Sequence, residues 1–384
     1  MRFPEFEGEW VESKIGEIVS IKSDKYNPET DELEYPCVEL ESLSQSTGEL
    51  LSTFNSKNQK SIKNVFNPGD VLFGKLRPYL RKYYQADFEG VCSSEIWVMK
   101  STVLNPLYLY AFVQSNIFQE LTEISSGSRM PRGDWDLISA TVINYPCEIS
   151  EGEKIGKLFQ VINARISTQN KIIEGLAVLK AALSKNIFYQ QLRFPEFKEK
   201  WIEMRLGEVC EIVGGGTPDT NKSEYWNGNI QWFTPTEIKA NSVSKSERTI
   251  TKLGLKNSSA KILPKGAILL TTRATIGEAS IALEECTTNQ GFQSLVVKGG
   301  FDNIFIFNWI KENKYELVKR ANGSTFPEIS KSEIEKIGIP TPTLSEQDKI
   351  AQFLSAIDRK IELEIVILSL FTKQKRYLLQ QMLV

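Results

Sequence analysis

Two stretches of the chain carry apolar residues at alternating spacings of three and four positions, the pattern of a helix that packs along one side. They lie in residues 151–190 and 345–382, and the second stretch contains neither glycine nor proline. Gln169 interrupts the first apolar seam, and Glu364 and Lys375 interrupt the second. One such helix cannot bury its seam alone, so we expect the two helices to form an antiparallel coiled coil.

The alternative is that these are core helices of two separate domains, but ordinary globular helices are far shorter. Ser150 stands three residues before Glu153, and Ser345 stands three residues before Asp348. This spacing predicts that both helices begin with a capping box. A helix over residues 345–382 would be roughly 57 Å long.

The other two regions, residues 1–150 and 193–343, alternate short strand-like runs with turns. Examples of such runs are residues 70–73 and 267–270. Each region also contains a helix-like stretch near its end, at residues 107–120 and 304–319. This mixture predicts two α/β (α+β) domains rather than all-helical or all-strand ones.

The two halves of the chain repeat one plan. Residues 2–10 read RFPEFEGEW and residues 193–201 read RFPEFKEKW, so six of the nine positions are identical. Gly127, Ser128 and Pro131 recur in the same spacing as Gly323, Ser324 and Pro327. A repeat of about 190 residues suits a domain with a connector. We therefore expect a pseudo-twofold chain with domains at 1–150 and 193–343 and spacer helices at 151–192 and 344–384.

Composition narrows the classes of function. The chain contains no histidine, the commonest general base and transition-metal ligand. Its five cysteines are far apart, which disfavours a disulfide framework or a zinc site. No apolar run reaches the length of a membrane span, and the first residues lack the apolar core of a signal peptide, so a cytoplasmic protein is expected. The net charge of −2 counts mildly against a DNA binder.

Three motifs carry a resemblance to a known family. Residues 214–218 read GGGTP, residues 225–232 read YWNGNIQW, and residues 339–351 lead into the second long helix. In this order, and with the repeated domain-and-helix plan, the chain resembles the specificity subunits of Type I restriction–modification enzymes. The first half departs from the pattern, because residues 20–26 stand where the GGTP motif would be.

The resemblance implies a function without catalysis by this chain. Each globular domain would be a target-recognition domain that reads one half of a bipartite, asymmetric target in double-stranded DNA. The helices would set the gap between the halves and dock two modification (methyltransferase) subunits, which methylate adenine. Restriction subunits with motor and nuclease activity would complete the assembly. S-adenosylmethionine, ATP and Mg²⁺ are expected in those partners, and no cofactor, metal or catalytic residue is expected in this chain.

Candidate DNA-binding residues follow from the chemistry of the grooves and of the phosphate backbone. Arginine suits guanine, asparagine and glutamine suit adenine, and lysine, arginine and hydroxyl groups suit phosphates. Arg77 and Arg273 both follow a strand-like run in matching places of the two halves. The first-domain candidates are Lys75, Arg77, Arg81, Lys82, Ser128, Arg129 and Arg132. The second-domain candidates are Thr271, Thr272, Arg273, Asn289, Gln290, Gln293, Asn322, Ser324 and Thr325.

Other functions fit the residues less well. Asp302, Glu312 and Lys314 have the composition of a nuclease site but fall on an expected helix. Asn105 followed by proline lacks the second proline of a methyltransferase motif and suits a helix start. The glycines at 214–216 are not followed by the lysine of a phosphate-binding loop, so a turn is favoured. The serious alternative is a non-catalytic adaptor that binds only protein partners.

Overall fold

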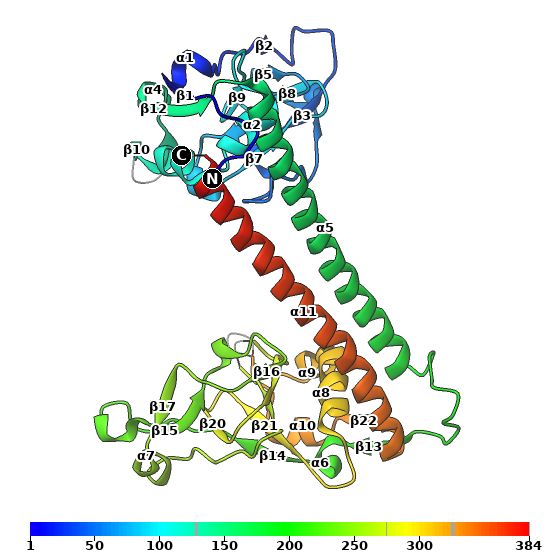
Figure 1. Cartoon of the computed structure of the whole chain (residues 1–384). Coiled ribbons are helices and arrows are strands. Elements are labelled where there is room, and N and C mark those ends of the chain that lie inside the picture. Colours follow the sequence, from blue (N-terminus) through cyan, green and yellow to red (C-terminus); the bar gives the residue numbers. More distant parts are fainter. Residues whose placement is uncertain (127–129, 274, 324–326, 384) are drawn as a thin grey trace. The chain divides into compact units, whose positions relative to one another are not determined.

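The computed structural model describes residues 1–126, 130–273, 275–323 and 327–383 (Figure 1). The chain forms two compact units. Unit 1 comprises Met1–Ile173 with Glu364–Val384, and unit 2 comprises Glu174–Leu363. The two long helices, α5 (Ile149–Phe188) and α11 (Leu344–Met382), each contribute one segment to each unit. Ser128, Arg129, Ser324 and Thr325, four of the candidate DNA-binding residues, lie outside the described residues.

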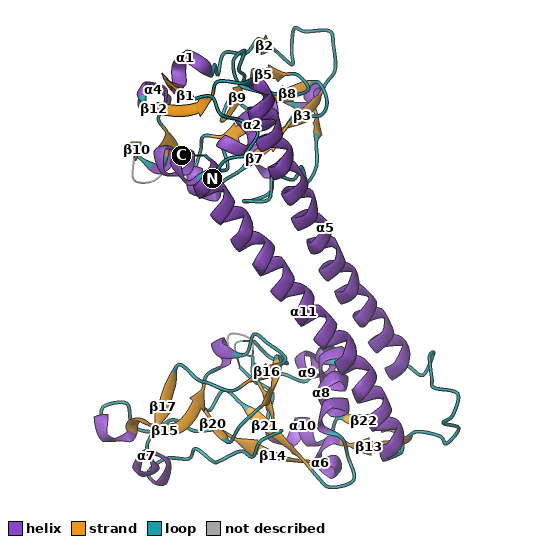
Figure 2. Cartoon of the chain, viewed as in Figure 1, coloured by secondary structure: helices purple, strands orange, loops and turns teal. Residues whose placement is uncertain are grey.

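The globular part of unit 1 is a mixed α/β fold (Figure 2). Strands form a five-stranded sheet of order β2-β5-β8-β3-β4, a three-stranded sheet of order β7-β6-β9, and the pairs β1-β12 and β10-β11. The strands are β1 (Trp10–Lys14), β2 (Lys25–Tyr26), β3 (Pro36–Val38), β4 (Phe54–Asn55), β5 (Lys63–Phe66), β6 (Val71–Gly74), β7 (Tyr83–Gln85), β8 (Gly90–Cys92), β9 (Ile96–Met99), β10 (Ser125–Ser126), β11 (Arg132–Gly133) and β12 (Val142–Pro146). The helices are α1 (Ile15–Ile18), α2 (Pro106–Phe112), α3 (Asn116–Glu123) and α4 (Trp135–Ala140).

The globular part of unit 2 has a related set of elements. Its sheets have the orders β14-β21-β18-β19-β16, β17-β15-β20 and β13-β22. The strands are β13 (Ile202–Arg205), β14 (Cys210–Gly214), β15 (Trp226–Phe233), β16 (Ser242–Val243), β17 (Arg248–Ile250), β18 (Ile268–Leu270), β19 (Ala279–Ala282), β20 (Cys286–Thr288), β21 (Gln293–Val297) and β22 (Gly338–Thr341). The helices are α6 (Leu206–Val209), α7 (Lys252–Lys256), α8 (Asn303–Glu312), α9 (Lys314–Lys319) and α10 (Lys331–Glu335).

The two helix-like stretches predicted near the domain ends are each two helices. In unit 1 the break falls at Ser115, whose hydroxyl accepts a hydrogen bond from the amide of Phe118 at 3.3 Å and so starts α3. Asn105 caps α2 in the same way through the amide of Leu107, as the sequence predicts. In unit 2, Asn313 separates α8 from α9. A polar side chain that bonds nearby backbone ends one helix and begins the next.

The predicted capping boxes are wrong, because both long helices begin two residues earlier than N-capping serines would require. Helix α5 starts at Ile149 and α11 at Leu344, so Ser150 and Ser345 lie inside the first turn. The carbonyl oxygen of Thr343 accepts the amides of Glu346 and Gln347, both at 3.0 Å. The first-turn glutamates, Glu151 and Glu346, have a different role.

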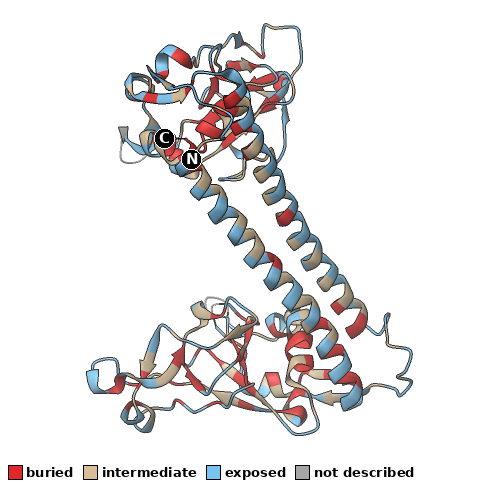
Figure 3. Ribbon diagram, in the orientation of Figure 1, coloured by how far each residue is buried: buried red, intermediate tan, exposed pale blue. Residues whose placement is uncertain are grey.

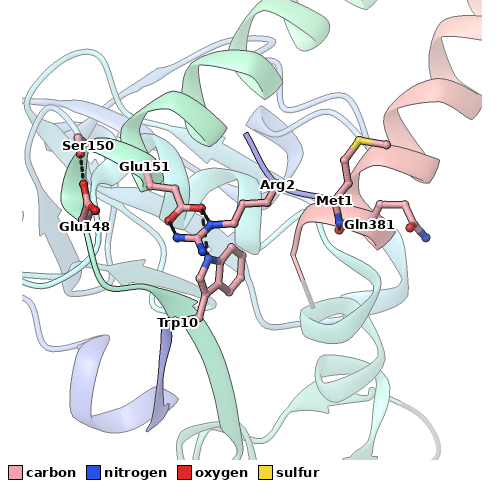
Figure 4. A network of polar contacts seen from close by, with 7 residues as sticks. All are labelled: Met1, Arg2, Trp10, Glu148, Ser150, Glu151 and Gln381. Carbon is pink, nitrogen blue, oxygen red and sulfur yellow. Dashed lines mark hydrogen bonds and ion pairs between the residues drawn. The ribbon is translucent and has the colours of Figure 1, made fainter. Parts of the chain in front are cut away.

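In each unit a first-turn glutamate binds the start of the repeated sequence motif. Nε and Nη2 of Arg2 donate to the two carboxylate oxygens of Glu151, both at 2.7 Å, and Nε1 of Trp10 donates to the same carboxylate at 3.3 Å (Figure 4). In unit 2, Arg193 makes the same paired contact with Glu346 at 2.8 Å. Both glutamates are fully buried. The repeated arginine therefore joins each globular part to the helix that follows it.

The long helices pack against each other in an antiparallel manner inside each unit. In unit 1, Gln169 donates to the backbone oxygen of Glu364 at 3.2 Å, and the Arg165 guanidinium lies 4.9 Å from the centre of the Phe371 ring. Followed in one direction along the helix pair, residue numbers thus rise in α5 and fall in α11. In unit 2, Lys180 donates to both carboxylate oxygens of Asp358 at 2.6 Å.

Apolar residues of the two helices also share the core of unit 2, where Ile187 and Phe188 of α5 pack in one cluster with Ile350 and Leu354 of α11. The predicted antiparallel packing is confirmed. The polar residues Gln169 and Glu364, which interrupt the two seams, bind each other, and a matched polar pair of this kind fixes helix register. Burial lowers the pKa of the third interrupting residue, Lys375, to about 8.

The substitution Glu151→Ala tests the anchor at the start of α5. It removes both acceptors of Arg2, and we expect the free energy of unfolding of the full chain to fall by about 2–3 kcal/mol. Urea denaturation followed by tryptophan fluorescence measures the change. The matched control is Glu153→Ala, because Glu153 pairs with Lys157 on the exposed side of the same turn and should lose less than about 0.5 kcal/mol. Equal losses in the two variants would contradict the anchor.

Candidate functional site

In unit 1, strand β6 leads into a loop that carries four of the candidate residues. Arg77 and Arg81 have backbone φ angles of 52° and 49°, in the left-handed region that residues other than glycine rarely adopt. The Arg77 side chain is exposed, and its amide donates to the carbonyl of Pro131 at 2.8 Å. Strained backbone held by long-range bonds clusters at functional loops. The fold thus fixes the place from which Arg77 projects.

The loop after β6 lies beside the β10–β11 hairpin. The amide of Gly133 donates to the carbonyl of Lys75 at 2.9 Å, and Leu76 forms a bridge with Arg132. Two candidate clusters that are far apart in the sequence therefore meet. Arg132 donates two hydrogen bonds to the Glu95 carboxylate, at 3.0 and 3.1 Å.

The remaining candidates of unit 1 are already engaged. The Lys82 ammonium donates to the carbonyl of Leu40 at 2.6 Å. Arg81 pairs with Glu123 at 3.4 Å, and both side chains are exposed. Lys75 is half-buried. Within the described part of the chain, Arg77 forms no ion pair, so it is the cation of this loop most available to a ligand.

In unit 2, the loop after β18 carries the corresponding residues. Thr271 and Thr272 are buried, and their hydroxyls donate to the carbonyls of Glu278 and Gly291, both at 3.1 Å. Their side chains therefore shape the loop from inside, which disfavours direct contact with a ligand. The next residue, Arg273, is exposed, and its Nε lies 2.9 Å from Oε1 of Glu328.

Asn322 and residues 327–329 approach this loop as β11 does in unit 1. Asn322 and Glu328 exchange two backbone hydrogen bonds at 2.9 Å, and the amide of Ile329 donates to the carbonyl of Thr272 at 3.3 Å. The Asn322 side chain is exposed. The backbone bonds align Thr272 with Lys75, because the amide of Thr272 donates to Gly291 as that of Lys75 donates to Glu95. Arg273 therefore corresponds to Leu76, and the two arginines lie on equivalent loops but one position apart.

The polar group at 289–293 gathers around the glycine motif. Gln290 is exposed and accepts a hydrogen bond from the hydroxyl of Thr217. Asn289 binds the amide of Gly291 at 2.8 Å, and Oε1 of the half-buried Gln293 has no partner. A Cβ at Gly215 would lie 2.0 Å from the carbonyl oxygen of Asn289. The motif therefore has glycine because two backbone segments touch there, and no helix follows it.

The residues weighed for nuclease chemistry do not form a site. Asp302 caps the start of α8 by accepting the amide of Phe305 at 2.6 Å, whereas Glu312 is the last residue of that helix. Lys314 pairs with Glu278. Across the described ranges, no group of three or more cysteine, aspartate or glutamate residues could hold a metal ion. Nor does that part of the chain contain a helix long and apolar enough to cross a membrane.

Comparison with known families identifies the chain. Residues 7–177 and 198–369 each match the family described as the Type I restriction modification DNA specificity domain. The chain belongs to this family. Each match covers one globular part and much of the long helix after it, so the two halves are tandem copies of the specificity domain.

Individual relatives agree with this assignment. The chain is 40% identical over 181 residues to the Type I restriction enzyme MjaIX specificity subunit of Methanocaldococcus jannaschii, an alignment that covers 44% of this chain and 42% of that relative. The chain thus matches under half the length of that relative. A putative MjaX specificity subunit of the same organism is 24% identical over 87% of this chain and 83% of its own length.

The fold agrees as well. A solved chain from the type I R-M system, described for its complex assembly and conformational transition, superposes with a TM-score of 0.64 at 19% identity. The superposition covers 98% of both chains. At this identity the likeness supports the fold of the specificity-domain chain and not its contacts with other molecules.

Sequence reasoning missed the acidic partners of the arginines. Glu95 and Glu328 reach Arg132 and Arg273 only through the fold, and no local pattern marks either pair. It also missed Arg248, whose guanidinium lies 3.6 Å from the Trp226 ring centre.

The pKa of Glu95 provides a test of the Arg132 contact. The hydrogen bonds from Arg132 hold the pKa of this carboxyl below its ordinary value. Because the pKa is lower in the folded chain, the pair stabilises the fold above the unfolded pKa of about 4.3 and this contribution is lost as pH falls through the folded pKa. We expect Arg132→Ala to raise the pKa of Glu95, as measured by carbon NMR titration.

The matched control is Arg81→Ala, because Arg81 pairs with Glu123 and not with Glu95. It should leave the titration of Glu95 unchanged. An unchanged Glu95 titration in Arg132→Ala would show that the hydrogen bonds do not form in solution.

Proposed function

We propose that this chain reads the DNA sequence for a Type I restriction–modification assembly, with each globular part reading one half of a bipartite, asymmetric target. The observation that carries the proposal is that the equivalent loop of each unit presents an arginine, Arg77 in unit 1 and Arg273, one position earlier, in unit 2. Both arginines are exposed, and each follows a central strand beside a hairpin segment. Because the surrounding residues differ between the two copies, the two half-sites are expected to differ.

The chemistry of the two surfaces suits base reading in the major groove. A guanidinium can bind O6 and N7 of guanine together, and amide side chains suit adenine. Among the candidates of unit 2, Asn322 and Gln290 have exposed amide side chains, whereas the candidates of unit 1 are mostly lysine and arginine. Lys82 and Arg81 suit phosphate contacts, which position a protein without carrying sequence information. The net charge of −2 is compatible with this role because lysine and arginine number 46 in the chain and some of them lie in these loops.

The long helices suit a spacer. Helix α5 has 40 residues, so its length is about 60 Å, many times the rise of about 3.4 Å between base pairs. A spacer of constant length would fix the gap between the two half-sites. In symmetric DNA-binding dimers, the spacing of the half-sites likewise follows the geometry of the protein.

The same helices offer surfaces for protein partners. Long stretches of both helices are exposed (Figure 3). Large apolar side chains on them have exposed fractions from 41% to 65%. Apolar residues gathered on an exposed face mark interaction sites. We assign them to the docking of modification subunits, with restriction subunits completing the assembly. They are Val161, Ile172, Ile365, Val366 and Leu370 in unit 1, and Val178, Leu179 and Leu363 in unit 2.

Catalysis would then belong to the partners. The proposal assigns S-adenosylmethionine to the modification subunits and ATP with Mg²⁺ to the restriction subunits, on the family resemblance alone. It places the chain in the cytoplasm, because such an assembly acts on DNA inside the cell.

The substitutions Arg77→Ala and Arg273→Ala test the proposal in the full chain assembled with its modification subunits. Each should weaken binding to the cognate duplex by about 1–3 kcal/mol and relax discrimination in one half-site only. Binding is measured against duplexes with substitutions in either half and at several salt concentrations. Arg376→Ala, an exposed arginine on α11, removes the same charge and is the control.

The adaptor alternative predicts a different outcome. An assembly that binds only proteins would show no salt-dependent affinity for duplex DNA, and neither arginine variant would change it. That result would overturn the proposal.

Shortening both helices together tests the spacer. Deleting residues 170–176 from α5 and 357–363 from α11 removes two helical turns on one side of the Gln169–Glu364 pair. The helix pair becomes about 10 Å shorter, which we expect to shorten the gap between half-sites by about three base pairs. Mapping methylated adenines in a genome where this is the sole specificity subunit measures the gap.

The deletion also removes Asp358, the partner of Lys180. The single substitution Asp358→Asn is therefore the control and should leave the gap unchanged. An assembled deletion variant that methylates the original target would exclude a spacer role for the helices.

A further inference from the structure

The two copies hold the exposed arginines of these equivalent loops by different means. In unit 1 the backbone of Arg77 is held in the left-handed region, and its amide is bound to Pro131. In unit 2 Arg273 is not among the residues with positive φ. Its side chain instead forms an ion pair with Glu328, in which Nε is the closest guanidinium nitrogen at 2.9 Å. Unit 2 therefore orients its arginine through a carboxylate.

The residue at the position of Glu328 has the opposite charge in unit 1. There Arg132 follows Pro131, as Glu328 follows Pro327. Arg132 uses both Nε and Nη2 to bind Glu95. Within the described residues, the two terminal nitrogens of Arg273 donate no hydrogen bond, and bidentate recognition of a base needs two such nitrogens.

The ion pair contributes little to the stability of the fold. The side chains of Arg273 and Glu328 are 48% and 38% exposed, and exposed ion pairs have small effects on stability. Backbone hydrogen bonds from Asn322, Glu328 and Ile329 already hold this segment in place. The effect of Glu328 is therefore on the direction of the Arg273 guanidinium, which bidentate recognition requires to be constant.

We propose that Glu328 is a positioning residue that holds Arg273 so that its two terminal nitrogens bind O6 and N7 of a guanine in the half-site read by unit 2. This inference rests on the proposed function and deepens it, because it names the base and the residue that orients its reader. It also separates two arginines that look alike in the sequence: Arg273 reads a base, whereas Arg132 ties the hairpin to Glu95.

Glu328→Gln tests the proposal, since it keeps the size of the side chain and removes its charge. In the full assembly we expect about a fivefold loss of affinity for the cognate duplex and no loss for non-cognate duplex. Removing a negative charge near DNA would by itself raise both affinities, so a selective loss reports positioning. Glu333→Gln, which removes a carboxylate paired with Lys336 in the same unit, is the control and should change neither affinity.

A double-mutant cycle locates the effect. Arg273→Ala and the double variant Arg273→Ala/Glu328→Gln should lose the same discrimination, because Glu328 acts through Arg273. Each guanine of the second half-site is then replaced in turn by 7-deazaguanine, which lacks the N7 acceptor. At one position this replacement should weaken binding by the wild-type assembly but not by Arg273→Ala or the double variant.

Additive losses, or a Glu328→Gln variant that gains affinity for cognate and non-cognate duplex alike, would overturn the positioning role. Failure of the proposed function would look different, because the wild-type assembly would then show no preference for cognate over non-cognate duplex.

Discussion

The buried ion pair between an arginine and a first-turn glutamate is the contact on which the organisation of both units depends. Arg2 binds Glu151 and Arg193 binds Glu346, each through two hydrogen bonds to a fully buried carboxylate. A buried carboxylate without its partner would be strongly unfavourable, so each globular part must stay at the start of its helix. The direction of each long helix is therefore set by the globular part that precedes it. The motif at residues 2–10 and 193–201 supplies the arginine of this contact in both units.

The candidate surface of each unit is assembled by backbone hydrogen bonds between segments that are distant in the sequence. The strand that ends near Arg77 or Arg273 is central in its sheet, and the hairpin segment is bound to the loop after it. The two copies share this framework but differ in charge, because Arg132 stands where the other copy has Glu328. A common framework with different side chains is what two different half-sites require. The carboxylates beside the arginines also show that a cation in the sequence is not automatically free to bind DNA.

Several features could be predicted from the sequence and several could not. The antiparallel pairing followed from the apolar seams, and the equivalence of the loops after β6 and β18 followed from the internal repeat, although Arg77 and Arg273 lie one position apart on them. The breaks at Ser115 and Asn313 were missed because a polar side chain can end or begin a helix within an otherwise helical pattern. Thr271 and Thr272 were included as candidates although their hydroxyls face inward. Strand alternation shows which residues share a face, but not which face is covered.

The sequence by itself determined the repeat, the long helices, the mixed α/β class and the family, because these depend on periodicity and on motifs that persist along the chain. Only the tertiary structure decided which acidic partner each arginine has. The pairs Arg132–Glu95 and Arg273–Glu328 form between segments that the fold brings together. The physical reason is that charge and hydrogen-bond partners act over a few ångströms in space, and separation along the chain does not report that distance.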